Sequence, residues 1–292
     1  MAIQVTTVFD PDTFTATHLL VDVASGEAAI VDPVLAFDQK SGRTDTHTID
    51  TLLAQAERQQ LTLRYVLETH AHADHLTSAD YIRQRCGAEI VIGQPITQVQ
   101  QIFADIFNEG DAFLRDGSQF DRLVGDGDVL KLGDTVVEVL ATPGHTPACV
   151  SYLVAGEAVF VGDTLFMPDV GSARCDFPGG DARTLYQSAQ RLLALDDEVT
   201  MYLCHDYPPA SDAGEARPVQ TQVSVKQQRL HNIHLREGIS EDEFVALRRG
   251  RDAGLDVPRL ILPSLQVNIR AGAFPQAEDN GSHYLKIPLN QL

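Results

Sequence analysis

One short segment constrains this chain more than any other: three histidines and an aspartate within six residues, His70, His72, Asp74 and His75. The segment follows a short apolar run at residues 64–67 that we predict to be a buried strand. Side chains at positions i and i+2 of an extended segment point to the same side, so His70 and His72 can face one metal ion. Imidazole and carboxylate groups together suit zinc, iron or manganese. A solvated histidine-rich loop is the alternative interpretation.

Three further potential ligands each follow a predicted strand. His145 lies in the segment TPGHTP, Asp163 in GDTLF and His205 in CHDY. Side chains that leave the ends of several strands converge on one rim of a fold, where loops carry function. Each residue alone is compatible with a structural role. Together with the histidine cluster, they predict a single metal site.

The order of the elements predicts two packed sheets. Short extended segments come first, and strands then alternate with helices expected at residues 49–60, 76–86, 96–107, 183–194, 219–230 and 241–251. This order is not a strict βαβ alternation, which argues against one doubly wound parallel sheet. We expect an α+β fold with helices outside two mixed sheets. Residues 1–215 would form the catalytic domain, and residues 216–292 a helical and irregular extension packed on it.

The composition narrows the classes of partner. The chain has 41 acidic and 22 basic residues, a net charge of −19, which argues against binding nucleic acids or an anionic membrane. It has no apolar run of about 18 residues, so we expect no transmembrane helix. The N-terminus is typical of a first strand rather than a signal peptide. Four cysteines without a CxxC pair indicate reduced, mostly buried thiols and a cytoplasmic protein: Cys86, Cys149, Cys175 and Cys204.

The four motifs, in this order, resemble the metallo-β-lactamase superfamily over at least residues 15–207. The resemblance implies an αβ/βα sandwich with the metal at one edge. Within the superfamily, residues 68–79 and the segment Arg174-Cys175-Asp176-Phe177 resemble the persulfide dioxygenases, relatives of the ethylmalonic encephalopathy protein. That family often has a cysteine two residues before the arginine, where this chain has Ser172.

The family resemblance implies a specific reaction. One Fe²⁺ per chain would be held by His70, His145 and Asp163, which are then the catalytic residues. Two histidines and one carboxylate leave coordination positions free for O2 and a persulfide sulfur. The implied reaction converts glutathione persulfide and O2 to glutathione and sulfite.

The metal count stays open at this stage. The same residues could hold two zinc ions, as in glyoxalase II, and a metal-bound hydroxide would then hydrolyse an acyl-glutathione thioester. A non-catalytic metal-binding or glutathione-sensing protein is a third alternative. The metal identity and count separate the three. Four residues would either surround the iron ligands or hold a second metal: His72, Asp74, His75 and His205.

Glutathione carries two carboxylates and one ammonium group, so an acidic protein must supply cations to bind it. Arginine is favoured because its guanidinium can pair with a carboxylate through two hydrogen bonds. The predicted substrate-binding residues are Arg174, Asp176, Tyr207, Arg217 and Lys226. The basic cluster at residues 248–251 is more typical of a helix C-terminus. The sequence leaves the oligomeric state open, a homodimer included.

Overall fold

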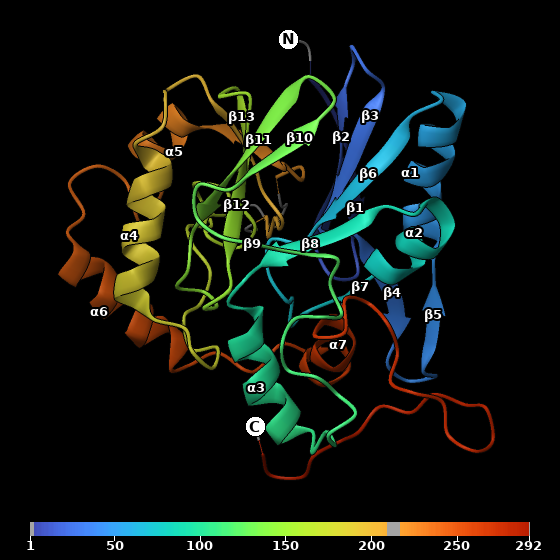
Figure 1. Ribbon diagram of the computed structural model, residues 1–292. Coiled ribbons are helices and arrows are strands. Elements are labelled where there is room, and N and C mark those ends of the chain that lie inside the picture. Colours follow the sequence, from blue (N-terminus) through green and yellow to red (C-terminus); the bar gives the residue numbers. More distant parts are fainter. Residues whose placement is uncertain (1–2, 209–216, 292) are drawn as a thin grey trace.

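Two six-stranded sheets form the centre of the computed structural model, which describes residues 3–208 and 217–291 (Figure 1). The first sheet has the order β1-β2-β3-β6-β8-β9 and the second β10-β11-β12-β13-β14-β15, while β5-β4-β7 form a smaller sheet. The strands are β1 Ile3–Asp10, β2 Thr15–Asp22, β3 Glu27–Val31, β4 Val34–Asp38, β5 Arg43–Asp45, β6 Thr62–Leu67, β7 Leu76–Thr77, β8 Glu89–Gly93, β9 Arg122–Val124, β10 Val129–Leu132, β11 Thr135–Ala141, β12 Val150–Val154, β13 Ala158–Phe160, β14 Thr200–Tyr202 and β15 Gln222–Ser224.

Helices cover the outer faces of both sheets. Figure 1 shows α1 and α2 on the side of the first sheet and α4, α5 and α6 on the side of the second. The helices are α1 His47–Arg58, α2 Ala79–Cys86, α3 Ile96–Ile106, α4 Ala182–Leu193, α5 Val225–His231, α6 Glu241–Asp252 and α7 Ile261–Asn268. This arrangement confirms the predicted sandwich.

Three layers of buried apolar side chains hold the sandwich together. The layer between the sheets includes Leu20 and Leu67 from the first and Val139 and Tyr152 from the second. Each outer face packs on its own helices, and α1, α3 and α4 have their buried residues along the side that faces the sheet. Strands buried on both faces are therefore nearly continuous apolar runs.

The strand directions bring the predicted ligands to one edge. β3 is parallel to β6, and β13 is parallel to β14, so the residues that follow each pair leave the same end. Two backbone bonds also join the sheets at this edge. Val150 donates to the Thr69 carbonyl at 2.9 Å, and Ala16 donates to the Cys204 carbonyl at 2.6 Å.

The C-terminal segments differ from the prediction. Residues 219–230 form strand β15 and then α5 instead of one helix, because the Ser224 side chain caps α5 in a capping box with Gln227. Residues after 258 were expected to be irregular but contain α7. Pro263 is tolerated there because it lies in the first turn, where its missing N–H has no helical partner. The boundary predicted at residue 215 lies outside the described residues and stays a prediction.

The segment between Asp32 and His75 also contains unpredicted structure. β4 and β5 form a hairpin, and β4 pairs with β7, placing Leu35 opposite Leu76. Leu76 and Thr77 are therefore in a strand, and the helix predicted from residue 76 begins at Ala79. The helix ends as predicted, with Gly87 in the left-handed conformation at φ 70°. Every helix of residues 3–208 and 217–291 is too short or too polar to cross a membrane.

Candidate metal centre

The structure brings His70, His145 and Asp163 together. Each offers one ligand atom, and these atoms lie within 4.8 Å of one another. One Asp163 oxygen lies 3.8 Å from Nε2 of His70 and 3.6 Å from Nε2 of His145. All three residues are buried although they follow different strands, β6, β11 and β13. Gly144 permits the tight approach of His145, since a Cβ there would lie 2.3 Å from the Leu185 backbone.

Hydrogen bonds orient both imidazole rings. Nδ1 of His145 lies 2.7 Å from the Arg174 carbonyl, which can only accept, so Nδ1 carries the proton. Nδ1 of His70 lies 3.0 Å from the Thr69 hydroxyl. That hydroxyl donates its own hydrogen to Asp32, so it accepts from His70. Both rings therefore present the lone pair of Nε2 to the shared space, the form that binds a metal.

A cation is the group that this arrangement fits. Nε2 of His70 is buried and has no hydrogen-bond partner, and neither has the Asp163 oxygen that faces His205. A lone pair that faces a carboxylate in a buried site is unfavourable unless a positive charge lies between them. The residues present thus suit a divalent metal bound by two imidazoles and one carboxylate.

A second group of buried polar atoms adjoins the first. Nε2 of His205 lies 3.2 Å from Asp74 and 3.3 Å from the other Asp163 oxygen. His205 and His75 donate their Nδ1 protons to the carbonyls of Phe14 and Leu76, so their Nε2 atoms are also free. The ligand atoms of His72, His75, Cys204 and His205 all lie within 4.8 Å of one another. Asp163 therefore faces both groups, one with each oxygen.

His72 is oriented in the opposite way. Its Nε2 lies 3.1 Å from Asp32, and its Nδ1 is the buried atom without a partner. Asp32 also accepts bonds from the backbone and the hydroxyl of Thr69. Asp32 and Glu68, which lies 3.9 Å from His72, were not among the site residues predicted from the sequence. The only indication in the sequence was the position of Asp32, directly after a predicted strand. In the structure its φ is 47°, which is rare for a non-glycine residue.

Burial and mutual charge separate the pKa values of these groups. Burial and the nearby His72 charge lower the pKa of His70 well below its usual range and that of His75 to about 3. Burial opposes the protonation of His72 as well, but the carboxylates of Asp32 and Glu68 outweigh it and raise its pKa to about 9. Burial and the Asp32 charge raise the pKa of Glu68 to about 8.

Asn268, on α7, holds the histidine segment in place. Its amide nitrogen donates to the carbonyls of His72 and His75 at 2.8 Å each, and its oxygen accepts from the Thr77 N–H at 2.9 Å. Sequence reasoning missed this residue because it lies 193 positions after His75, in a segment expected to be irregular. Its three bonds hold the turn that carries the second group of potential ligands.

Arg174 and Asp176 lie beside the site but bind each other. The guanidinium makes two bonds to the Asp176 carboxylate, at 2.5 and 2.6 Å, and a third to the Asp256 carbonyl at 2.6 Å. Arg174 contacts the site through its main-chain carbonyl, which accepts a hydrogen bond from His145. The predicted binding of glutathione by these two side chains stays a prediction.

The other predicted substrate residues are placed differently from one another. Arg217 bonds to both oxygens of Asp169 and of Asp206, and Asp206 directly follows His205. Lys226 is exposed, and its backbone N–H donates to the carbonyl of Asp197. Asp197 precedes β14, whereas His205 follows the end of that strand. Lys226 thus lies at the opposite end of β14 from the site, a position that does not favour contact with a substrate there.

Aromatic side chains form a wall beside His205. The Tyr207 ring stacks on His205 with centroids 5.5 Å apart and meets Phe166 edge to face at 5.6 Å. The Phe14 ring is also adjacent to Tyr207, with centroids 5.7 Å apart. Tyr207 and Phe14 are about half exposed, so this wall reaches from the buried ligands to solvent.

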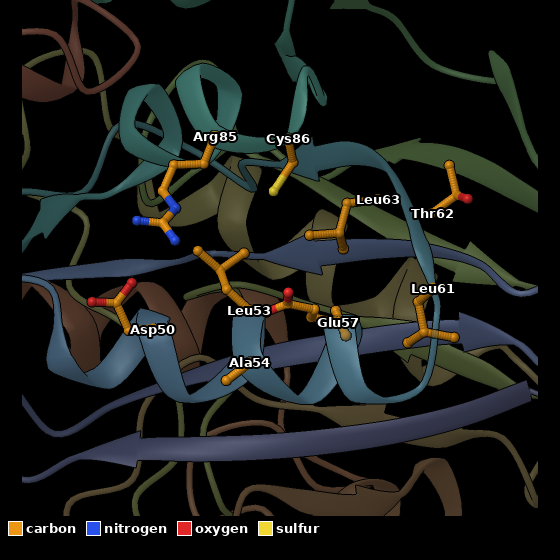
Figure 2. Close-up of a pocket in the computed structure, with 10 residues that line it drawn as sticks. Asp50, Leu53, Ala54, Glu57, Leu61, Thr62, Leu63, Arg85 and Cys86 are labelled. Carbon is orange, nitrogen blue, oxygen red and sulfur yellow. The ribbon is translucent and has the colours of Figure 1, made fainter.

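A hollow of about 680 Å³ is separate from these residues (Figure 2). It is lined by α1, the end of α2 and the beginning of β6, and it includes Arg85 and Cys86. Thr62 and Leu63 belong to the start of β6, whereas His70 follows its end. The hollow is therefore at the far end of the strand from the candidate metal centre.

Comparison with known proteins places the chain in one superfamily. The profile of the metallo-beta-lactamase superfamily matches residues 12–205. A protein of Burkholderia pseudomallei named "Probable metallo-hydrolase" is 52% identical over 97% of this chain and 98% of its own length. "Glyoxylase B2" of Dictyostelium discoideum is 47% identical over 95% of this chain and 94% of that protein.

Persulfide dioxygenases are also among the relatives. "Persulfide dioxygenase ETHE1, mitochondrial" of Mus musculus is 30% identical over 90% of this chain and 87% of that protein. The crystal structure of ETHE1 from Myxococcus xanthus superposes with a TM-score of 0.72 at 31% identity, covering 94% of this chain and all of that one. The relatives with higher identity thus carry hydrolase-type names, and those with the dioxygenase name are more distant.

Proposed function

The chain is an enzyme of the metallo-beta-lactamase superfamily with a metal-binding site, and from this premise we propose that it is a persulfide dioxygenase. The proposed reaction combines glutathione persulfide, O2 and water to give glutathione, sulfite and two protons. The outer sulfur loses four electrons, which reduce O2, and the bond between the two sulfur atoms breaks.

One observation carries this proposal: the ligand atoms of two histidines and one aspartate converge, and His72 is not among them. His72 turns its Nε2 to Asp32 instead. A site of His70, His145 and Asp163 has the composition of a mononuclear iron centre with open coordination positions. The 30% identity to the mouse persulfide dioxygenase supports the same assignment.

In this proposal the site binds one Fe²⁺ per chain, and neighbouring groups orient its ligands. When bound, the iron would supply redox chemistry and free coordination positions for O2 and sulfur. Thr69 and the Arg174 carbonyl hold the rings of His70 and His145 in the ligating tautomer. Burial of these ligands keeps bulk water away from the reacting groups.

We propose that the glutathione part of the substrate lies along the aromatic wall of Phe14, Phe166 and Tyr207. This wall joins His205 to solvent, and the Tyr207 hydroxyl offers a hydrogen bond. Arg217 bonds to Asp206, next to His205, and the Arg174 carbonyl contacts His145; each guanidinium would have to exchange part of its pairing with Asp169 or Asp176 for a substrate carboxylate. Such an exchange is less favourable than binding to an unpaired arginine.

A binuclear hydrolase is the second candidate, and one observation favours it. The two oxygens of Asp163 face the two groups of buried imidazoles, as a carboxylate that bridges two metals would. His75, His205 and Asp74 could then hold a second ion, and an acyl-glutathione thioester would be the substrate. The names of the relatives at 52% and 47% identity support this alternative.

Metal content and oxygen uptake decide between the two. Protein purified without oxygen or chelator should contain about one iron per chain and consume O2 with glutathione persulfide, releasing an equal amount of sulfite. Chelation should abolish this activity, and Fe²⁺ but not Zn²⁺ should restore it, because zinc has no redox chemistry. Two tightly bound zinc ions and anaerobic hydrolysis of S-lactoylglutathione, without O2 uptake on persulfide, would favour the hydrolase and refute the dioxygenase.

A further inference from the structure

The loop at residues 171–177 sets the orientation of His145. The carbonyl of Arg174, in the middle of this loop, accepts the Nδ1 proton of His145 at 2.7 Å. The loop has neither helical nor strand structure, so it has no regular backbone hydrogen bonding of its own to hold that carbonyl in place. Whatever fixes the loop backbone therefore also fixes the imidazole ring.

Helix α6 contacts the loop backbone on both sides of Arg174. Nη1 of Arg248 donates to the Ser172 carbonyl at 2.9 Å, and Asp252 accepts from the Cys175 N–H at 2.9 Å. Ser172 and Cys175 are both buried. The two contacts are three residues apart in the loop, so they define its position and its direction at Arg174.

Arg248 and Asp252 form a buried ion pair one helical turn apart. Nη2 of Arg248 lies 2.6 Å from Asp252, and the side chains are 3% and 8% exposed. They continue the inner face of α6 from Phe244, because residues four apart share a helix face. An apolar pair at such positions is often at least as stable as a buried ion pair. An apolar pair could not make the hydrogen bonds to Ser172 and Cys175. These bonds explain why charged residues occupy positions 248 and 252.

The beginning of the loop is anchored by a third group. Nδ1 of His234, which is buried, accepts from the Ser172 N–H at 3.1 Å. Gly171 is required at this contact, since its φ is 103° and a Cβ would lie 2.2 Å from the His234 ring. The loop therefore enters its contact with α6 from a defined position.

We propose that Arg248 and Asp252 are positioning residues of the metal centre, which act on His145 through the Ser172–Cys175 backbone. This inference rests on the proposed function only in taking His145 as a metal ligand. It replaces the interpretation of Arg248 as one of several helix-end charges. It also makes α6, which follows the predicted catalytic domain, part of the apparatus that shapes the site.

Replacement of the pair by apolar residues tests the proposal. Arg248→Met with Asp252→Leu should keep α6 packed while removing both loop contacts. The readout is the affinity of the apo-protein for Co²⁺ and the visible spectrum of the Co²⁺ protein, neither of which depends on turnover. Affinity should fall about 10- to 100-fold, as for other groups that orient a metal-bound histidine, and the spectrum should shift. The dioxygenase reaction could fail its own test without changing this result.

Two further variants separate positioning from loss of stability. Val245→Ala removes buried apolar contact from α6 without touching the loop, and it should lower the melting temperature with unchanged Co²⁺ affinity. Asp252→Asn keeps an acceptor for Cys175 but loses the charge that holds Arg248, so a smaller, several-fold loss of affinity is expected. This variant decides the matter if the double variant does not fold.

A double-mutant cycle links the effect to His145. In a His145→Ala background, the loss caused by Asp252→Asn should disappear, because the ring on which it acts is gone. Equal losses with and without His145 would overturn the proposal. Unchanged Co²⁺ affinity and spectrum in folded Arg248→Met/Asp252→Leu, or an equal loss of affinity in Val245→Ala, would overturn it as well.

Discussion

The two halves of the candidate metal centre are held by different kinds of group. In the histidine segment, the Asp32 carboxylate holds the His72 ring and the Asn268 amide holds the backbone, while the His75 ring bonds to the neighbouring Leu76 carbonyl. His145 and His205 are held by main-chain carbonyls, of Arg174 and Phe14. A side-chain holder can be removed by one substitution, whereas a carbonyl is present in every residue. Substitutions can therefore disturb the orientation of His145 and His205 only by displacing the backbone that carries these carbonyls.

Loss of Asp163 should have the largest effect, because its carboxylate faces both halves, His70 in the first and His145 and His205 in the second. Asp163→Ala removes the carboxylate that faces His70 and His145 and should abolish retention of iron. His205→Ala, on the edge of this group, should leave much of the iron bound, with an affinity loss of about 10- to 100-fold. Elemental analysis after dialysis measures both. Equal loss of iron in the two variants would mean that the two groups form one binuclear site.

Asn268→Ala tests the half that side chains hold. It leaves two carbonyls and the Thr77 N–H without their partner, which should lower the free energy of unfolding by about 1–3 kcal/mol. Co²⁺ affinity should fall about tenfold, since the turn that carries His72 and His75 loses its fixed position. Asn280→Ala, which removes an exposed amide bonded to Tyr284, is the matched control and should change neither quantity. Wild-type affinity in Asn268→Ala would show that the turn keeps its shape without the amide.

His234→Gln tests the half that the backbone holds, with the smallest expected effect. Burial and the charges of Arg248 and Arg251 lower the pKa of His234 to about 4. Between pH 6.5 and 4 the unfolded chain therefore binds the proton more readily than the folded chain, so stability falls as the pH falls. Glutamine offers an uncharged acceptor to Ser172 and removes this dependence.

Urea unfolding of the apo-proteins measures the difference. From pH 6 to pH 5 the wild type should lose about 1 kcal/mol more than His234→Gln, near the limit of about 1.4 kcal/mol per pH unit for one proton. Parallel pH profiles of the two proteins would show that His234 is protonated in the folded state and does not accept from Ser172.

The contiguous motif was the part of the site that sequence could reveal. The spacing of His70, His72, Asp74 and His75 is local, and so are the glycine and turn residues around His145 and Asp163. The strands before them were recognisable from their apolar runs. The parallel pairing of β3 with β6 and of β13 with β14 then brings the following residues to one edge.

The sequence by itself determined which residue types meet at the edge of the sandwich, because strand order and short loops leave them little freedom. Only the tertiary structure decided how each ring is turned. That depends on Asp32, Asn268 and Arg248, which lie 40 or more positions from the ring or loop that they hold and belong to segments without a recognisable motif. A hydrogen bond requires its partners within about 3 Å at a suitable angle, and residue spacing does not encode such a distance between remote segments.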